Sequence, residues 1–492
     1  MHPLVVSQKA NDKIDRAPEA RLEEACGLAA AIELDIVGAQ IVSLTRLRPA
    51  TLFGVGKVKE ISDQLDAISP RPDLVIVDSA LSPVQHRNLE KEWACKVLDR
   101  TALILEIFGA RANTAEGRIQ VELAHLTYQR SRLVRSWTHL ERQRGGAGFL
   151  GGPGERQIEA DRRALATKID RLRIRLEQVR RTRTLQRAKR KRAPHAVVAL
   201  VGYTNAGKST LFNRLTNADV KAQDLLFATL DPTMRAVTLA SGEKIVLSDT
   251  VGFISDLPTQ LIAAFRATLE EVQEADVIVH VRDAAHPDSD AQRDDVLSVL
   301  AALGVGGDKI ETASVAGTAE NEGPAVIEAL NKIDLMDAEG RRVAEATARV
   351  SEERALLTIE EPLKVCLSAV TGEGVDTFVD CLNTLITRSR GYFEVSLGPA
   401  DGAARAWLHQ NGDIVEISSG DSDPHTDENA EMQASDRETI LVRLSEKSAG
   451  QLKKRFPDIV TAPSTSNATP SGAKPSGAKP SSAKPSSERQ IA

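Results

Sequence analysis

The feature that most constrains this chain is the eight-residue motif GYTNAGKS, which begins at Gly202. It is a complete G-x-x-x-x-G-K-S sequence, it directly follows the apolar run 196–201, and a helical pattern over residues 210–215 comes after it. In this context the N–H groups of a glycine-rich loop surround a β-phosphate, Lys208 reaches the β- and γ-phosphate oxygens, and the Ser209 hydroxyl can bind Mg²⁺. The motif therefore predicts a nucleotide site in an α/β fold.

The length of 492 residues exceeds what one hydrophobic core usually serves, and 41% apolar residues suffice for several cores. We therefore expect a multidomain α/β protein. Its predicted parts are, in order, a flexible N-terminus (1–25), an N-terminal α/β domain (26–112), a basic antiparallel helical hairpin with a Gly-rich tip (113–192), the nucleotide-binding domain (193–389) with an acidic surface insertion (304–323), a small α+β domain (390–460) and a disordered tail (461–492).

Short apolar runs and amphipathic patterns predict the elements of the outer domains. In the N-terminal domain we expect strands at 39–44, 74–77 and 96–98 and helices at 56–68 and 83–93. In the small C-terminal domain we expect strands at 392–396, 414–417 and 439–444, with an acidic loop at 418–438. The tail repeats a unit of Ser, Gly, Ala, Lys and Pro that cannot form a core.

Two segments before the motif show apolar residues at spacings of three and four, which is typical of a helical seam. Two such helices joined by a short linker predict an antiparallel hairpin with arms of ~30 Å or more at 1.5 Å per residue. The bend is the stretch RQRGGAGFLGGPGER at 142–156. The predicted seam positions are Ile119, Leu123, Leu126, Arg130, Leu133, Trp137, Leu140, Ile158, Leu165, Ile169, Leu172, Leu176 and Val179.

The charge of the chain is unevenly distributed. Its formal net charge is −6, yet residues 130–192 hold 20 Lys/Arg against 6 Asp/Glu, a local +14. Such a segment is suited to an anionic partner. At the tip, Arg142, Arg144 and Arg156 can pair with RNA phosphates, and Phe149 can stack on a base. The alternative is a solvated hairpin whose glycines only make the turn.

Three later motifs select guanine nucleotides. In DTVG at 249–252, Asp249 can hold Mg²⁺ through a water and the Gly252 N–H can sense the γ-phosphate. In NKID at 331–334, the Asp334 carboxylate can accept from both N1–H and N2–H₂ of guanine, which adenine cannot satisfy. After the apolar run 363–367, the Ala369 N–H can reach guanine O6. The set predicts a P-loop GTPase domain with a Ras-like parallel or mixed sheet and flanking helices.

Two points of the predicted chemistry stay open from the residues alone. A threonine of LLFATLDPTMR (225–235) must complete the Mg²⁺ site, and position does not choose between Thr229 and Thr233. Phe253 stands where many small GTPases carry a Gln, and its side chain cannot orient a water by hydrogen bonding. We therefore predict slow intrinsic turnover that is stimulated when the protein docks on a partner. Alternatively, another side chain of the isolated protein orients the attacking water.

The cysteines and the apolar runs bear on the compartment. Cys26, Cys95, Cys366 and Cys381 form neither a CxxC pair nor a metal-ligand spacing, which favours a reducing compartment. The N-terminus lacks the apolar core of a signal peptide, and no apolar run approaches the ~20 residues of a membrane span. We expect a cytoplasmic protein.

The motifs closely resemble those of the HflX family of translation-factor-related GTPases. The resemblance rests on GYTNAGKSTLFN (202–213), LFATLDPT (226–233), DTVGFI (249–254), NKID and SA, on ERQRGGAGFLGGPGERQIE (141–159), and on IVDSALSPVQHRNLE (76–90), and it covers about residues 30–460. It implies that Thr229 is the magnesium threonine. It also implies that the hairpin lies against ribosomal RNA near the peptidyl transferase centre.

Together these observations give the following candidate residues. The catalytic candidates are Lys208, Thr229 and Gly252, and the metal ligands are Ser209 and Thr229. The nucleotide-binding candidates are Gly202, Tyr203, Thr204, Asn205, Ala206, Gly207, Lys208, Ser209, Thr210, Phe227, Ala228, Thr229, Leu230, Asp231, Asp249, Thr250, Val251, Gly252, Asn331, Lys332, Ile333, Asp334, Ser368, Ala369 and Val370. The RNA-contact candidates are Arg142, Arg144, Phe149 and Arg156.

The predicted function is that of a Mg²⁺-dependent, GTP-hydrolysing switch that alternates between GTP and GDP. The resemblance implies that it binds the large ribosomal subunit and splits or rescues stalled ribosomes under stress, and we expect a monomer. Two alternatives remain: an RNA-binding protein in which GTP is mainly structural, and a GTPase of another RNA-linked process. Measurable GTP turnover separates the first of these from a switch.

Overall fold

The computed structural model describes residues 3–9, 17–44, 46–143, 153–190, 195–216, 226–227, 233–239, 242, 244–255, 271–302, 324–357, 362–388, 391–419, 438–444, 446–457 and 459–463. The chain separates into two compact units, Met1–Ser389 and Arg390–Ala492. Several predicted features lie outside the described residues: the tip of the hairpin (144–152), the insertion (304–323), most of the acidic loop (420–437) and the tail after 463.

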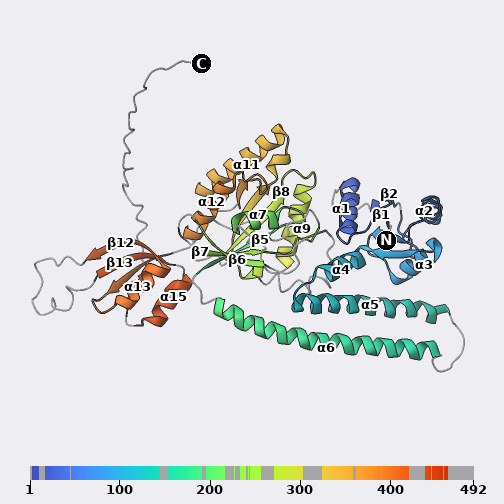
Figure 1. The fold of residues 1–492 in the computed structure, drawn as a ribbon, viewed down its shortest axis with the longest axis horizontal. Helices are drawn as coiled ribbons and strands as arrows, with labels where there is room; N and C mark the ends of the chain where they lie inside the picture. The colour runs from blue at the N-terminus through green and yellow to red at the C-terminus, as the bar shows by residue number, and fades with distance from the viewer. Residues whose placement is uncertain are drawn as a thin grey trace, which may run out of the picture. The chain divides into compact units, whose positions relative to one another are not determined.

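The first sheet is parallel, with strand order β2-β1-β3-β4 (Figure 1). The predicted strands and helices of this region are confirmed to within one residue or two. β3 is buried at all five positions, as its unbroken apolar run indicates. The elements are β1 (Pro3–Lys9), α1 (Pro18–Ala30), β2 (Gly38–Ser43), α2 (Val55–Ala67), β3 (Leu74–Asp78), α3 (Pro83–Trp93), β4 (Lys96–Asp99) and α4 (Arg100–Arg111).

The expectation of a flexible segment over 1–25 is wrong for most of these residues. β1 (Pro3–Lys9) lies between β2 and β3 and is parallel to both. α1 starts at Pro18, a residue suited to a first turn, and buries Ala25 and Leu28. The sequence PLVVSQK has too few apolar residues to signal a strand by itself, and pairing on both edges supplies what its composition lacks.

The helical hairpin consists of α5 (Ala115–Gln143) and α6 (Pro153–Arg190), which lie side by side in Figure 1. The predicted seam is confirmed at six positions. Leu126, Ile169 and Leu172 form a buried cluster against which further seam residues pack, namely Ile119, Leu123 and Leu165. Arg130, Leu176 and Val179, which are also described, are not part of this cluster. At 1.5 Å per residue α6 is ~57 Å long. Leu133, Trp137, Leu140 and Ile158 belong to the parts of the helices whose side chains are not described.

The second sheet has strand order β10-β9-β8-β5-β7-β6 and is parallel except for β6, which pairs antiparallel with β7. This is the mixed α/β sheet that the motifs predict. In β5, Val198 and Leu200 face α7 and α12, whereas Ala199 and Val201 belong to the core of the other side, with α9. The elements are β5 (Ala196–Val201), α7 (Lys208–Thr216), β6 (Thr233–Thr238), β7 (Lys244–Asp249), β8 (Val277–Asp283), α9 (Ser289–Ala302), β9 (Ala325–Asn331), η1 (Ile333–Leu335), α11 (Ala338–Leu357), β10 (Leu363–Cys366) and α12 (Val375–Arg388).

The second unit is a four-stranded antiparallel sheet, with order β12-β13-β11-β14 and its helices packed on one face. The three predicted strands are confirmed, and β14 is an additional strand that the sequence did not signal. The elements are β11 (Gly391–Leu397), α13 (Gly402–Asn411), β12 (Asp413–Ser419), β13 (Glu438–Leu444), α15 (Glu446–Arg455) and β14 (Val460–Pro463). Among all described residues, no helix has the length and apolarity that crossing a bilayer requires.

Candidate guanine-nucleotide site

The phosphate loop connects the carboxyl end of β5 to the first residue of α7, Lys208. The Lys208 side chain is buried, and its ammonium donates to the Tyr203 carbonyl at 2.7 Å. The loop is joined to the DTVG segment by two backbone bonds, from Thr204 N to Phe253 O at 2.7 Å and from Phe253 N to Gly202 O at 3.0 Å. The fold therefore places the predicted phosphate-binding residues against the predicted γ-phosphate sensor.

Burial lowers the pKa of Lys208 to about 8, and the Asp249 carboxylate offsets only part of this shift. Lys208 is charged below that pKa, and phosphate binding needs the charged form. From pH 7 to pH 9 the charged fraction of the nucleotide-free protein falls about tenfold, and GDP affinity should fall by the same factor. Calorimetric titration across this range measures it. A flat wild-type profile would refute the assignment.

Two of the residues predicted to hold magnesium, Ser209 and Asp249, lie together at the exit of the loop. Ser209 Oγ donates to Asp249 Oδ2 at 2.7 Å, and Asp249 is fully buried at the end of β7. The neighbouring Thr250 donates to the Leu200 carbonyl at 2.6 Å, which fixes the backbone after β7. A hydroxyl and a carboxylate form an oxygen-only donor set, which fits a hard divalent cation such as Mg²⁺.

Gly252 lies directly against the phosphate loop. A Cβ at Gly252 would lie 2.8 Å from the Thr204 Cα and 3.0 Å from the Lys208 Nζ. A side chain would therefore displace the loop. Phe253, next in sequence, is 2% exposed and belongs to the apolar cluster that contains Ile254 and Phe227. Its ring is packed among apolar groups, where it cannot contact a water at the phosphates.

The base-recognition loops meet around Asn331. Its amide donates from Nδ2 to the Ala206 carbonyl at 2.8 Å, and its Oδ1 accepts from the Ala369 N–H at 2.9 Å. The Ala369 N–H, which we predicted to reach guanine O6, is thus engaged by Asn331 in this structure. Lys332 pairs with Asp283 at 2.7 Å. The exposed Asp334 carboxylate makes no hydrogen bond or ion pair with the described residues and is accessible to a base.

Of the predicted switch segment, 225–235, the structure describes Leu226, Phe227 and residues 233–235. The Phe227 ring packs edge-on against Phe108 of α4, with 4.7 Å between ring centroids. The Leu226 side chain lies against Gly27 of α1. Ala228, Thr229, Leu230 and Asp231 lie outside the described residues, and Thr233 is the first residue of β6.

A charged cluster that sequence reasoning missed connects the N-terminal sheet to this site. Arg100, the first residue of α4, is 4% exposed and donates to Asp78 Oδ1, to Glu24 Oε1 and to Ser255 Oγ, the last at 2.9 Å. Tyr203 of the phosphate loop donates from its hydroxyl to Glu24 Oε2 at 2.8 Å and accepts from the Ser255 N–H at 2.9 Å. No local pattern marks Arg100 or Glu24, because their partners are distant in sequence.

The position of this cluster is informative. Asp78 ends β3 and Arg100 follows β4, so the cluster lies at the carboxyl edge of the first parallel sheet. In open α/β sheets this edge is where ligands usually bind. Here it contacts the phosphate loop through Tyr203 and the segment after DTVG through Ser255. The N-terminal domain is therefore bonded to two parts of the nucleotide site.

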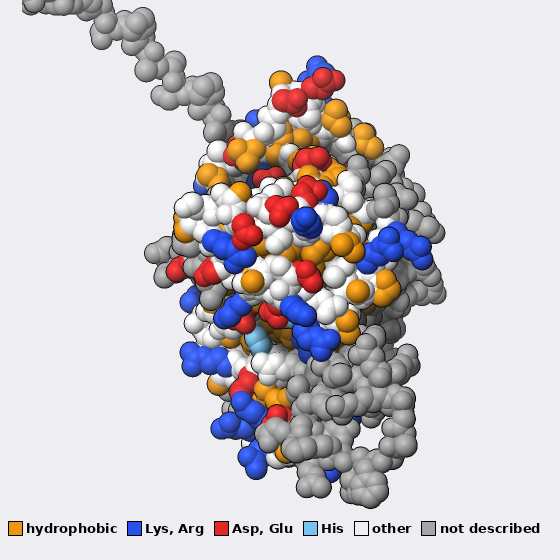
Figure 2. Space-filling model, turned by 90° about the vertical axis from the view of Figure 1, so that its right-hand side faces the viewer, with side chains coloured by type: hydrophobic (Ala, Val, Ile, Leu, Met, Phe, Trp, Pro, Cys, Tyr) orange, Lys and Arg blue, Asp and Glu red, His pale blue; other side chains and the backbone are white. Residues whose placement is uncertain are grey.

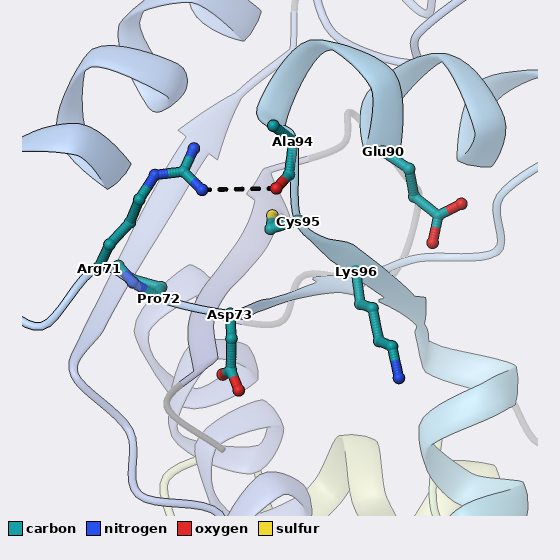
Figure 3. A pocket seen from close by; sticks show the side chains of 7 residues that line it. All are labelled: Arg71, Pro72, Asp73, Glu90, Ala94, Cys95 and Lys96. Carbon is teal, nitrogen blue, oxygen red and sulfur yellow. Dashed lines mark hydrogen bonds between the residues drawn. The ribbon is translucent and has the colours of Figure 1, made fainter.

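A hollow of about 510 Å³ lies at the opposite edge of the same sheet, lined by Arg71, Pro72, Asp73, Glu90, Ala94, Cys95 and Lys96 (Figure 3). The Arg71 guanidinium donates to the Trp93 carbonyl at 2.8 Å and to Asp66 at 2.8 Å. Burial raises the pKa of the Cys95 thiol to about 11, so the thiol is protonated and unreactive at neutral pH. The polar groups serve the packing of α3, and we assign no ligand to this hollow.

The predicted RNA-contact residues are only partly covered by the structure. Arg142 lies on α5 and Arg156 on α6, but their side chains are not described. Arg144 and Phe149 lie outside the described residues altogether. On the face drawn in Figure 2, Lys/Arg and Asp/Glu side chains are interspersed over the described surface. That face carries mixed charge, whereas the excess of positive charge belongs to residues 130–192.

Comparisons with known proteins match GTP-binding GTPases along most of the chain. Three family models match: GTP-binding GTPase N-terminal over residues 19–109, GTP-binding GTPase Middle Region over 111–190, and 50S ribosome-binding GTPase over 197–304. The GTPase HflX of Magnetococcus marinus is 46% identical over 418 residues, which cover 85% of this chain and 90% of that protein. The GTPase HflX of Escherichia coli is 42% identical over 373 residues, covering 75% of this chain and 80% of that protein.

The comparisons and the geometry agree on the chemistry. A complete phosphate loop, a DTVG segment bonded to it and an NKID loop bonded to the phosphate loop through Asn331 form one site on a mixed sheet. The relatives cover the N-terminal domain and the hairpin as well as this sheet. The protein hydrolyses GTP, and the chain belongs to the HflX family of GTPases.

Proposed function

We propose that this GTPase is a switch that binds the large ribosomal subunit through the α5–α6 hairpin and promotes the splitting or rescue of stalled ribosomes. The observation that carries the proposal is the arginine-rich surface of α6. Arg162, Arg171 and Arg175 are exposed and form no ion pair with any acidic side chain of the described residues. Arginines without acidic partners suit a phosphate-rich surface such as ribosomal RNA. The family model described as a 50S ribosome-binding GTPase supports the choice of subunit.

Hydrolysis in this site depends mainly on positioned charge. Lys208 and the N–H groups of the phosphate loop would hold the β- and γ-phosphates, and the Gly252 N–H would sense the γ-phosphate. Ser209, Thr229 and, through a water, Asp249 would hold Mg²⁺, which neutralises charge that develops on the phosphate oxygens. Because the Phe253 ring is buried, the isolated protein should turn over slowly until the partner reorders the site.

The nucleotide state would reach the hairpin through the N-terminal domain. Tyr203 and Ser255 are bonded to Glu24 and Arg100, and Phe227 packs on α4. α4 is in turn in contact with α5, the first arm of the hairpin. A change in the DTVG segment or in the switch segment on GTP binding would therefore move groups that the N-terminal domain contacts.

The hairpin is tested with a matched pair of triple variants. Changing Arg162, Arg171 and Arg175 to Gln should weaken binding to isolated large subunits by at least tenfold and reduce the salt slope by about one per lost phosphate contact. The control changes Arg163, Arg173 and Arg181 to Gln, because these are paired with Glu159, Asp170 and Glu177. Cosedimentation with large subunits at several salt concentrations measures the binding of both triple variants.

Two further outcomes bear on the same proposal. Deleting residues 145–154 should abolish the stimulation of GTP hydrolysis by large subunits. Unchanged binding by both triple variants, or full stimulation of the deletion protein, would exclude the hairpin as the ribosome-binding element. Stimulation by another structured RNA in place of the subunit would favour a GTPase of a different RNA-linked process.

A further inference from the structure

Arg214, in the last turn of α7, contacts the loop that follows β10. Its Nε donates to the Ala369 carbonyl at 2.6 Å, and its Nη2 donates to the Val370 carbonyl. The guanidinium also lies against Gly372, where a Cβ would come within 2.5 Å of Nη1. Gly372 has φ +92°, so neither the backbone conformation nor the space admits a side chain there. The arginine therefore fits closely into the turn formed by residues 368–372.

The same turn is held on its other side. The Ala369 N–H donates to Asn331 Oδ1 at 2.9 Å, and the Thr371 N–H donates to Ser368 Oγ at 3.1 Å. The Gly372 N–H donates to the Ser368 carbonyl at 2.8 Å. Among the described residues, the Val370 N–H has no acceptor, and the Val370 side chain is 69% exposed. Val370 therefore presents the available backbone donor of this turn.

The direction of that donor follows from Arg214. The Ala369 carbonyl and the Val370 N–H belong to one peptide group, and in a trans peptide the two bonds point in opposite directions. Because Arg214 Nε holds the carbonyl on the α7 side, the Val370 N–H points away from α7. If Asp334 accepts from N1–H and N2–H₂ of guanine, the O6 atom, on the other side of N1, is the part of the base that faces this turn.

We propose that Arg214 is a positioning residue for guanine recognition, which aims the Val370 N–H at the O6 atom of the base by holding the Ala369 carbonyl. Arg214 does not touch the nucleotide itself. The inference deepens the GTPase activity and does not depend on the ribosome, so the failure of either idea leaves the other intact.

The direct test is the dissociation rate of fluorescent GDP from Arg214→Met. Methionine keeps an unbranched stem beside the cavity that Arg214 lines with Leu215, Val375 and Val379, and it removes both donors. Dissociation should accelerate by about 3- to 10-fold, the range expected for losing one aimed hydrogen bond. Arg214→Lys keeps one donor, so its GDP dissociation rate should lie between those of the wild type and Arg214→Met. A rate equal to that of the wild type would overturn the proposal.

A matched control uses Arg341, which contacts Glu373, the residue directly after the turn. Arg341 of α11 forms ion pairs with Glu345 at 2.9 Å and with Glu373, both at the surface. Exposed pairs contribute little, so Arg341→Met should change GDP dissociation by less than about twofold. An equal acceleration in both variants would mean that any loss of anchoring loosens the turn, and the specific role of Arg214 would be wrong.

Affinities for base analogues distinguish the positioning role from a purely structural one. Inosine diphosphate lacks the 2-amino group but keeps O6, so Arg214→Met should weaken its binding by the same factor as that of GDP. In 6-thio-GDP a sulfur replaces O6 and is a poor acceptor, so its affinity should change by less than about twofold. Equal losses for GDP and 6-thio-GDP would show that Arg214 only stabilises the domain.

Discussion

Replacing Asp334 with Asn should lower GDP affinity by about 100- to 1,000-fold and transfer the preference to xanthosine diphosphate. The carboxylate accepts from two N–H groups of guanine, whereas an amide can accept from only one and directs an N–H at the other. A site built to hydrogen-bond a ligand rejects the wrong partner strongly, because buried polar groups are left without partners. Xanthine carries a carbonyl where guanine carries its 2-amino group, and that carbonyl accepts from the new amide.

Competition titrations with GDP and xanthosine diphosphate measure this change of preference. The structure gives the reason to expect a clean result: Asp334 is exposed and makes no bond to the described residues, so the substitution should not disturb the fold. Glu339→Gln, which neutralises another exposed carboxylate in the first turn of α11, serves as the control and should leave both affinities unchanged. Loss of GDP binding without gain of xanthosine diphosphate would contradict the assigned role of Asp334.

Replacing Arg100 with Met should destabilise the protein by about 3–5 kcal/mol, because it removes the cation that Glu24 and Asp78 share and leaves Asp78 only the longer contact to Arg21, at 3.7 Å. Arg100 and Asp78 are nearly fully buried, and water cannot take over the role of the guanidinium. Although burial disfavours its charge, Asp78 and Glu24 raise the pKa of Arg100, so it is charged at every pH at which the protein folds. Urea unfolding measures the change.

Tyr203→Phe is the companion variant, since it removes the hydroxyl that joins Glu24 to the Ser255 N–H and keeps every charge. Its loss of stability should be about 0.5–1.5 kcal/mol. The two variants separate stability from communication between the domains, because Tyr203→Phe breaks the link from the phosphate loop while the charged cluster stays paired. A destabilisation by Arg100→Met below that of Tyr203→Phe would show that the cluster is not buried as described.

The nucleotide site was predictable from the sequence because its chemistry is local. The GKS, DTVG and NKID motifs each follow a buried strand, and parallel strands bring their carboxyl ends to one edge of the sheet. That is why Lys208, Asp249 and Asn331 meet although they are far apart in the chain. The hairpin seam was predictable for the same kind of reason, since helical periodicity is written into the sequence.

What the sequence could not show are contacts between distant surfaces. Glu24 and Arg100 look like ordinary surface charges in helical patterns, and only the docking of α1 and α4 on the phosphate loop buries them. β1 was missed because a short strand with polar residues forms only through its pairing with the neighbouring strands β2 and β3. The engagement of the Ala369 N–H by Asn331, and with it the role of Arg214, depends on side-chain geometry that motif spacing does not contain.

The central claim is that the nucleotide in the guanine site controls how the hairpin engages the ribosome. The most direct test is cosedimentation of the full-length protein with isolated large subunits, loaded with a non-hydrolysable GTP analogue or with GDP. The account predicts binding that is about 5- to 150-fold tighter with the GTP analogue, and a smaller ratio for Tyr203→Phe. Equal binding in both nucleotide states of the wild-type protein would contradict it.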